Sequence, residues 1–352
     1  MPTRGISIAV DSVGIDPLGH DRPESVYAGS EFLFPRGRSG EVIPLPDAPC
    51  EAVLVETDVA SGCRRGAIEC ALTYTSHFSG FSAVERHGLM QGLGLNDRLL
   101  EGLIDESNLL RLFPDACLAN ALFPAHLPFL GGSYAKDLLP HVSREEVERT
   151  VRFRGSPLAL SGRPKRGLAE LFTLAEINQN IFIYAARQAG VRLRTWDDVR
   201  DGRALTSSLT HELEGEFDLE GMGARPLPAR SLDEAADVLA RLAAEHSFVF
   251  YKYQIADLVS HTGRLDLARA VFQVIERFVA AVLRRIDADE TLLLVTSDHG
   301  HLEQVSYHHG HPKGKVPTWC FGPSANQLAE RLRRPEGVFD AFAGLAMPAA
   351  AC

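Results

Sequence analysis

The feature that most constrains the fold is an apolar run that ends abruptly in metal-binding residue types. Residues 291–296 read Thr-Leu-Leu-Leu-Val-Thr, and the sequence Ser-Asp-His-Gly-His follows at once from residue 297. An unbroken aliphatic run of this length is typical of a strand that is buried on both faces in a parallel sheet. Such sheets bind ligands beyond the carboxyl ends of their strands. The segment therefore predicts an α/β protein with a ligand site where this strand ends.

Two more apolar runs lead into aspartates. Residues 6–10 run directly into Asp11, and residues 248–251 are followed within a few positions by Asp257, with His261 one helical turn later. Because the carboxyl ends of parallel strands lie at the same edge of a sheet, three strand ends are expected to bring their carboxylates to one rim.

Carboxylates and imidazoles from separate parts of a chain are the donors that surround a divalent ion. A single Asp is more often a helix cap and a single His a surface residue, but a set of such residues at several strand ends favours a metal site. The candidate ligands are Asp11, Asp257, His261, Asp298, His299 and His311. Six ligands suit two ions better than one, with His301, His308 and His309 as open alternatives. Mixed oxygen and nitrogen donors favour zinc or manganese over magnesium.

The order of the motifs adds a resemblance. Asp257-Leu-Val-Ser-His-Thr-Gly precedes Asp298-His-Gly, and His311 is followed by Val316-Pro317. With the Asp-x-Val-Gly that begins at Asp11, the chain resembles the alkaline phosphatase superfamily. The branch that it resembles most is that of the cofactor-independent phosphoglycerate mutases and phosphopentomutases.

The resemblance implies a fold and a division of the ligands. It implies an α/β sandwich of alkaline phosphatase type, with a central, mostly parallel sheet flanked by helices and a smaller inserted cap. Asp257, His261 and His311 would hold one metal ion. Asp11, Asp298 and His299 would hold the other, together with a nucleophilic hydroxyl.

The nucleophile is expected in the segment 70–80, where the superfamily places a Ser, Thr or modified Cys at the start of a helix. A gapless alignment puts Leu72 at that position, and a shift of one residue puts Thr73 there. We predict Thr73, because an alkoxide needs a hydroxyl. Thr75 and Cys70 are alternatives. Cys70 has the spacing of the sulfatase cysteine, but the Pro and Arg that follow that cysteine are absent here. A fourth possibility is that the protein has lost its nucleophile.

Positive charge is also expected near the transferred phosphoryl group, whose charge is spread over three oxygens. Lys313, close to His311, and Arg86 are the predicted substrate contacts, although each residue type is more often solvated at the surface.

The two ends of the chain carry the candidate ligands. We therefore expect residues 1–85 and 236–352 to form one metal-binding core and residues 86–235 to form an inserted cap. Helices are predicted over residues 169–190 and 265–286 and from residue 195, because apolar residues recur there at helical spacing or follow a capping residue.

Composition restricts the partners. The net charge is -10, and no long Lys/Arg run tracks a phosphate backbone, which argues against nucleic acid. No apolar stretch is long enough to span a bilayer, and no signal peptide precedes the first strand, so a cytoplasmic location without membrane partners is expected. Six cysteines without paired spacing are expected to be reduced thiols. The oligomeric state is left open.

The predicted function is two-metal phosphoryl transfer on a small phosphorylated metabolite. Hydrolysis of a phosphomonoester through a phosphothreonine is ranked first, because the insertion is short and the Asn-Ser-Glu nucleophile motif of the mutases is missing. The alternatives are an intramolecular phosphomutase, a phosphodiesterase or phosphonate-acting enzyme, and a metal-binding protein without catalysis.

Overall fold

The computed structural model describes most of the core and parts of the middle of the chain. The described residues are 2–19, 22–30, 33–34, 42–43, 52–61, 70–87, 97–121, 152–153, 180–211, 217–218, 227–306, 312 and 314–346.

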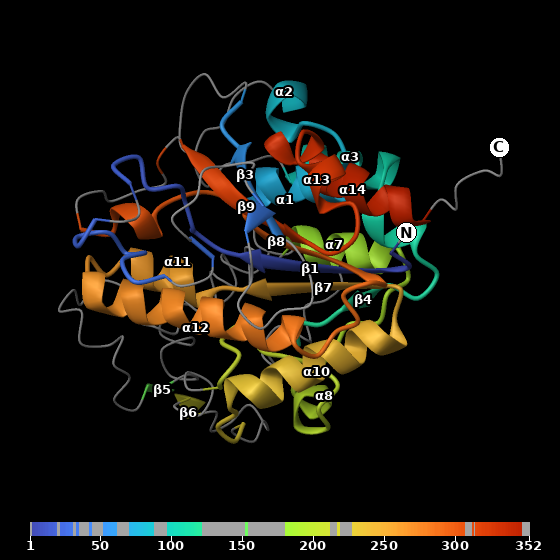
Figure 1. Cartoon of the computed structure of the whole chain (residues 1–352). Coiled ribbons are helices and arrows are strands. Elements are labelled where there is room, and N and C mark those ends of the chain that lie inside the picture. The colour runs from blue at the N-terminus through green and yellow to red at the C-terminus, as the bar shows by residue number, and fades with distance from the viewer. Residues whose placement is uncertain are drawn as a thin grey trace.

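A seven-stranded sheet organises the molecule, in the order β2-β3-β9-β8-β1-β7-β4 (Figure 1). Four neighbouring strands run parallel, and three antiparallel pairings extend the sheet beyond β8. The parallel strands are β8 (Thr291–Ser297), β1 (Arg4–Val10), β7 (Phe248–Tyr253) and β4 (Cys117–Leu118), and the others are β9 (Lys315–Phe321), β3 (Ala52–Asp58) and β2 (Val42–Ile43).

The register of the parallel strands fixes where the ligands lie. Val10, the last residue of β1, is aligned with Tyr253 on β7 and with Ser297 on β8. The three strands therefore end at the same level, and the residues that follow them start from one edge of the sheet.

Helices cover both faces of the sheet. One face packs against α8 (Trp196–Arg200), α10 (Leu232–Glu245), α11 (Ile255–Ser260) and α12 (Leu265–Leu283). The other packs against α1 (Cys70–Ser79), α3 (Asp97–Glu106), α7 (Asn180–Gln188) and α14 (Gly337–Ala346). Figure 1 shows these two sets on opposite sides of the sheet.

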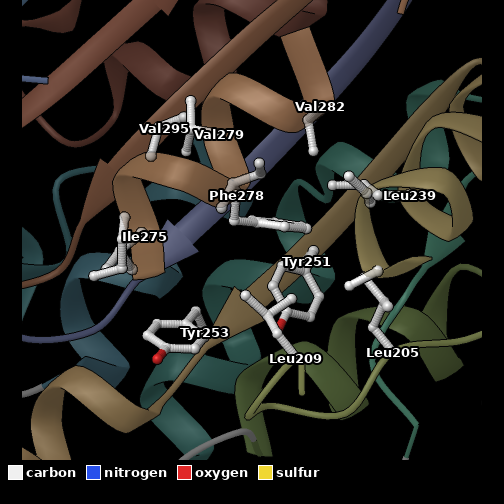
Figure 2. Close-up of a cluster of buried hydrophobic side chains, with 14 of the residues drawn as sticks. Leu205, Leu209, Leu239, Tyr251, Tyr253, Ile275, Phe278, Val279, Val282 and Val295 are labelled. Atoms are coloured by element: carbon white, nitrogen blue, oxygen red, sulfur yellow. The ribbon is translucent and has the colours of Figure 1, made fainter. Parts of the chain in front are cut away.

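Alternation along the strands divides the core into two apolar layers. On β7, Val249 and Tyr251 pack in the α10 and α12 layer, whereas Phe248 and Phe250 pack in the layer on the other face. Figure 2 shows Tyr251 beside Phe278 of α12, with Leu239 of α10 close by. Burial on both faces explains why these strands read as continuous apolar runs.

Short elements complete the described chain. They are α2 (Ala83–His87), α13 (Ala325–Leu328), three 3₁₀ helices (Leu109–Leu112, Leu302–Gln304 and Arg331–Arg333) and a separate two-stranded sheet of β5 (Arg152–Phe153) and β6 (Phe217–Asp218). Within the described residues, none of the helices has the length and apolar character needed to cross a bilayer.

The predicted fold class is confirmed: this is an α/β sandwich with a central, mostly parallel sheet flanked by helices. The helix expected over 265–286 is α12, and the helix expected from residue 195 is α8, capped by Thr195. Of the range 169–190, residues 180–188 form α7 and residues 169–179 lie outside the described chain.

The division into a core and a cap over 86–235 stays a prediction. Three described elements of that range lie against the core, since β4 pairs with β7 and both α3 and α7 contact α1.

Candidate metal centre

Four buried donors meet where β1 and β8 end and α1 begins. Ligand atoms of Asp11, Cys70, Asp298 and His299 all lie within 4.8 Å of one another. His299 Nε2 is 3.4 Å from Asp11 Oδ1, 3.6 Å from Asp298 Oδ2 and 3.2 Å from Cys70 Sγ. We call these four residues the Asp11 group.

The pKa shifts in the Asp11 group show that its buried carboxyl groups are costly to ionise without a cation. Burial, with the nearby Asp298 carboxylate, raises the pKa of Asp11 to about 7, and burial also raises the pKa of Asp298. Burial lowers the pKa of His299, which keeps the imidazole neutral and able to bind a metal. Two facing carboxylates, an imidazole and a thiol, all buried, therefore fit a divalent ion.

A second set of donors comes from α11 and from the loop after β8. Asp257, His261 and His301 also place their ligand atoms within 4.8 Å of one another, and we call them the Asp257 group. Asp257 Oδ1 is 3.4 Å from His261 Nε2, and the His261 and His301 rings are 4.6 Å apart between centroids. His301 is buried, whereas the side chain of His261 is 41% exposed. This group is therefore the one that faces solvent.

The charge on Asp257 is set by its partners. Although burial, the largest effect, raises the pKa of Asp257, the hydrogen bond and charge of His261 lower it below its usual range. Asp257 is thus an ionised carboxylate that is ready to bind a cation.

Ser12 lies between the two groups. Its hydroxyl donates to Asp257 Oδ1 and is 3.3 Å from His299 Nδ1, while its backbone N–H donates to Asp298 Oδ1 at 3.1 Å. The residue has a φ of 65°, a left-handed conformation that few non-glycine residues adopt. The structure thus brings the two groups into one centre through a strained residue.

The structure brings five of the six predicted ligands into these two groups. His311 and the predicted phosphate contact Lys313 lie outside the described residues. His301, which the sequence left open, joins the Asp257 group. Arg86 does not reach the centre: its guanidinium lies over the Phe81 ring and forms an ion pair with Glu106 at the surface.

The predicted nucleophile Thr73 and its alternative Thr75 both have hydroxyls that donate to the main chain. Thr73 Oγ1 donates to the backbone oxygen of Asp298 at 2.8 Å, and Thr75 Oγ1 donates to the backbone oxygen of Ala71 at 2.6 Å. Both hydroxyls are thus tied to the main chain. Cys70, the first residue of α1, is the one of these three candidates whose side chain lies among the metal donors.

Sequence reasoning missed two charged residues at the centre. Lys252 is fully buried on β7, with Nζ 2.8 Å from Asp11 Oδ2. Although burial lowers the pKa of Lys252, Asp11, Cys70 and Asp298 together raise it above its usual value, so the ammonium stays charged. Its signal in the sequence is a lysine inside the apolar run 248–253, where an unpaired charge would be costly.

Glu303 is the second of these residues. Its carboxylate accepts N–H bonds from Gly14 at 2.9 Å and from His301 at 3.0 Å, and so joins the loops that follow β1 and β8. Burial raises the pKa of Glu303 to about 7.

The fold and the centre define a class: an α/β protein with a candidate site for two divalent ions at the ends of parallel strands. Comparison with known proteins agrees with this class. Residues 224–348 match the model of the Metalloenzyme superfamily. The resemblance inferred from the motifs is thus confirmed over the part of the chain that carries β7, β8 and the Asp257 group.

Two curated relatives are both 2,3-bisphosphoglycerate-independent phosphoglycerate mutases. The one from Clostridium novyi is 31% identical over 116 residues, which is 32% of this chain and 23% of the relative. The one from Sulfurimonas denitrificans is 29% identical over 100 residues, which is 27% of this chain and 20% of the relative. The matched part therefore spans about a quarter or less of the length of these relatives.

The solved structures that match this chain have low sequence identity to it. PH0037 protein from Pyrococcus horikoshii matches 98% of both chains with a TM-score of 0.49 and 13% identity. Alkaline phosphatase from the Antarctic bacterium TAB5 matches 98% of both chains with a TM-score of 0.44 and 11% identity.

Proposed function

We propose that the protein is a metal-dependent phosphoryl-transfer enzyme that hydrolyses a small phosphomonoester. The observation that supports this most is the pairing of two donor groups through Ser12 at one edge of the sheet. Two nearby divalent ions can clamp a phosphate ester and stabilise both the attacking and the leaving oxygen. The match to the Metalloenzyme superfamily model and the mutase relatives support the same reaction class.

In this proposal Cys70 replaces Thr73 as the nucleophile. The Cys70 sulfur, as a thiolate, attacks phosphorus, and the ester P–O bond breaks as the alcohol leaves with a proton from solvent. A water oxygen then attacks the same phosphorus, the S–P bond breaks, and inorganic phosphate and the thiolate are released. In the metal-free protein, burial followed by the charges of Asp11 and Asp298 raises the pKa of the Cys70 thiol, so the thiolate depends on a bound cation.

The chain's own residues have distinct tasks in this scheme. Asp11, Asp298 and His299 would hold one ion near the Cys70 sulfur, and Asp257, His261 and His301 would hold the other. His261 is the exposed member, so we place the entry of the substrate on its side of the centre. Ser12 keeps the two donor groups in register.

The test is phosphate release from a panel of phosphomonoesters by metal-stripped protein that is reloaded with zinc or manganese. Cys70→Ala should abolish release. Thr73→Val, the matched control, keeps the shape of the side chain and should retain release. Loss of release in Thr73→Val, with a folded protein and bound metal, would return the nucleophile to Thr73. Faster turnover of a diester than of its monoester would favour the diesterase alternative.

A mutase is the second candidate, because the curated relatives of the matched segment are phosphoglycerate mutases. Its test is incubation with 2-phosphoglycerate or 3-phosphoglycerate. Interconversion of the two without free phosphate would replace the hydrolase proposal. A protein that binds metal but neither releases nor moves phosphate would be a metal-binding protein without this catalysis.

A further inference from the structure

The two carboxylate oxygens of Asp11 face different partners. Oδ1 is 3.4 Å from His299 Nε2 and 3.8 Å from Cys70 Sγ, which places it in the donor group. Oδ2 is 2.8 Å from Lys252 Nζ and accepts a hydrogen bond from Gln254 Nε2. Lys252 therefore contacts Asp11 on the oxygen opposite to the one that would bind an ion. The ammonium and an ion do not need to compete for one position.

Lys252 is held in place from the other side as well. Its Nζ lies 4.8 Å from the centroid of the Tyr74 ring and 5.6 Å from that of Phe182, both distances at which a cation is attracted by an aromatic face. Both rings are buried in the layer that contains α1 and α7. The lysine is thus fixed between a carboxylate and two aromatic rings.

A count of formal charges relates Lys252 to Cys70. A divalent ion and one ammonium group together balance two carboxylates and one thiolate. The Asp11 group is buried, and a buried cluster of charges is stable only when the charges compensate one another. With Lys252 present, the cluster is neutral when Cys70 binds the ion through a thiolate sulfur.

We propose that Cys70 is a sulfur ligand of the ion in the Asp11 group and that Lys252 is the positioning residue that fixes Asp11 from outside the ligand set. Partners of this kind orient a ligand, and removing one lowers metal affinity by about 10–100-fold. A thiolate donor also favours zinc-like ions over magnesium. The inference rests on the metal centre of the proposed function and not on the hydrolysis step.

The experiment is a titration of metal-stripped protein with Co²⁺, followed by the near-ultraviolet absorption that a thiolate-cobalt bond produces. We expect this absorption in the wild type and none in Cys70→Ser. Lys252→Met should weaken Co²⁺ binding by about 10–100-fold. Lys315→Met is the matched control, because Lys315 pairs with Glu56 near the surface and should leave the titration unchanged.

The opposite results overturn the proposal. If Lys252 merely repelled the ion, Lys252→Met would bind Co²⁺ more tightly, and a residue without a positioning role would leave the affinity unchanged. Absorption that persists in Cys70→Ser would assign the sulfur to another cysteine. If Lys252→Met does not fold, Gln254→Met removes the other partner of Asp11 Oδ2 without changing charge. It should weaken Co²⁺ binding, and unchanged affinity in this variant would contradict the positioning of Asp11 through Oδ2.

The failure of this inference is distinct from the failure of the proposed function. Cobalt-thiolate absorption without any phosphate release counts against the enzyme alone. Phosphate release that depends on metal, without cobalt-thiolate absorption, counts against the sulfur ligand alone.

Discussion

Ser12 Oγ donates a 2.6 Å hydrogen bond to Asp257 Oδ1, across 245 positions of the sequence. The bond ties the loop after β1 to the first turn of α11. Since the backbone N–H of Ser12 also donates to Asp298, one residue holds a carboxylate of each donor group. This arrangement makes Ser12 the place where the two groups can be uncoupled.

Ser12→Gly and Ser12→Ala both remove this hydroxyl but differ in their backbone cost. At a φ of 65°, glycine is unstrained, whereas alanine pays about 1–2 kcal/mol. In metal-free protein, urea unfolding should therefore show Ser12→Ala to be less stable than Ser12→Gly by about that amount. Equal stabilities would mean that the left-handed conformation is not retained at this position.

Gly14→Ala should destabilise the protein by about 1–3 kcal/mol, because a Cβ at residue 14 would overlap the Glu303 carboxylate. Urea unfolding measures the change. Gly102→Ala is the matched control: it lies in α3, where a Cβ meets no atom, and should be neutral or stabilising by up to about 1 kcal/mol. A Gly14→Ala protein of unchanged stability would show that Glu303 is free to move away.

His77 should make stability depend on pH. Burial lowers its pKa to about 3, and neither ring nitrogen has a hydrogen-bond partner among the described residues. Below about pH 6.5, His77 binds a proton in the unfolded chain but stays neutral in the folded protein. The free energy of unfolding therefore falls as pH falls from 6.5 towards 3.

The size of this effect can be measured with His77→Leu. Between pH 7 and pH 5, the wild type should lose about 2 kcal/mol of unfolding free energy through this residue. In urea unfolding at the two pH values, the free energy of unfolding of His77→Leu should fall by about 2 kcal/mol less than that of the wild type. Parallel pH profiles for the two proteins would show that His77 accepts a proton in the folded state.

Asp298→Asn should separate stability from metal binding. The change removes one of two facing buried carboxylates, and the new amide can donate to Asp11, so metal-free protein should gain about 1–3 kcal/mol. Thermal unfolding with and without zinc then measures metal binding. The wild type should be stabilised by zinc, by about 2.7 kcal/mol at a concentration of 100 times Kd, and the variant should lose most of this gain.

The strand ends and most of the candidate ligands could be predicted from the sequence. The aliphatic runs before Asp11 and Asp298 identify strands that are buried on both faces, and strands of that kind deliver the residues that follow them to one edge. The candidate metal donors Asp257 and His261 could be predicted because they share one turn of a helix directly after such a run. These signals are local, because each depends only on residues that are close together in the sequence.

The positions of Cys70 and Thr73 relative to the metal donors depend on tertiary structure. Both residues lie on α1, three positions apart and so on nearly the same face, but α1 begins at Cys70. The docking of the helix against β8 sets Cys70 beside His299 and leaves Thr73 one turn further along, against the backbone oxygen of Asp298. A shift of one residue in the start of a helix changes this outcome, and no pattern in the segment 70–80 fixes that start.

The sequence by itself determined the fold class, the sheet edge that carries the site and the donor types, because apolar periodicity and strand-end residues follow from chemistry along the chain. Only the tertiary structure decided that Lys252 faces Asp11, that Ser12 joins the two donor groups and that His301 lies in the second. Each of these contacts joins residues from different strands and loops, at distances set by strand register and helix docking. Their energies depend on burial, which the linear sequence does not specify.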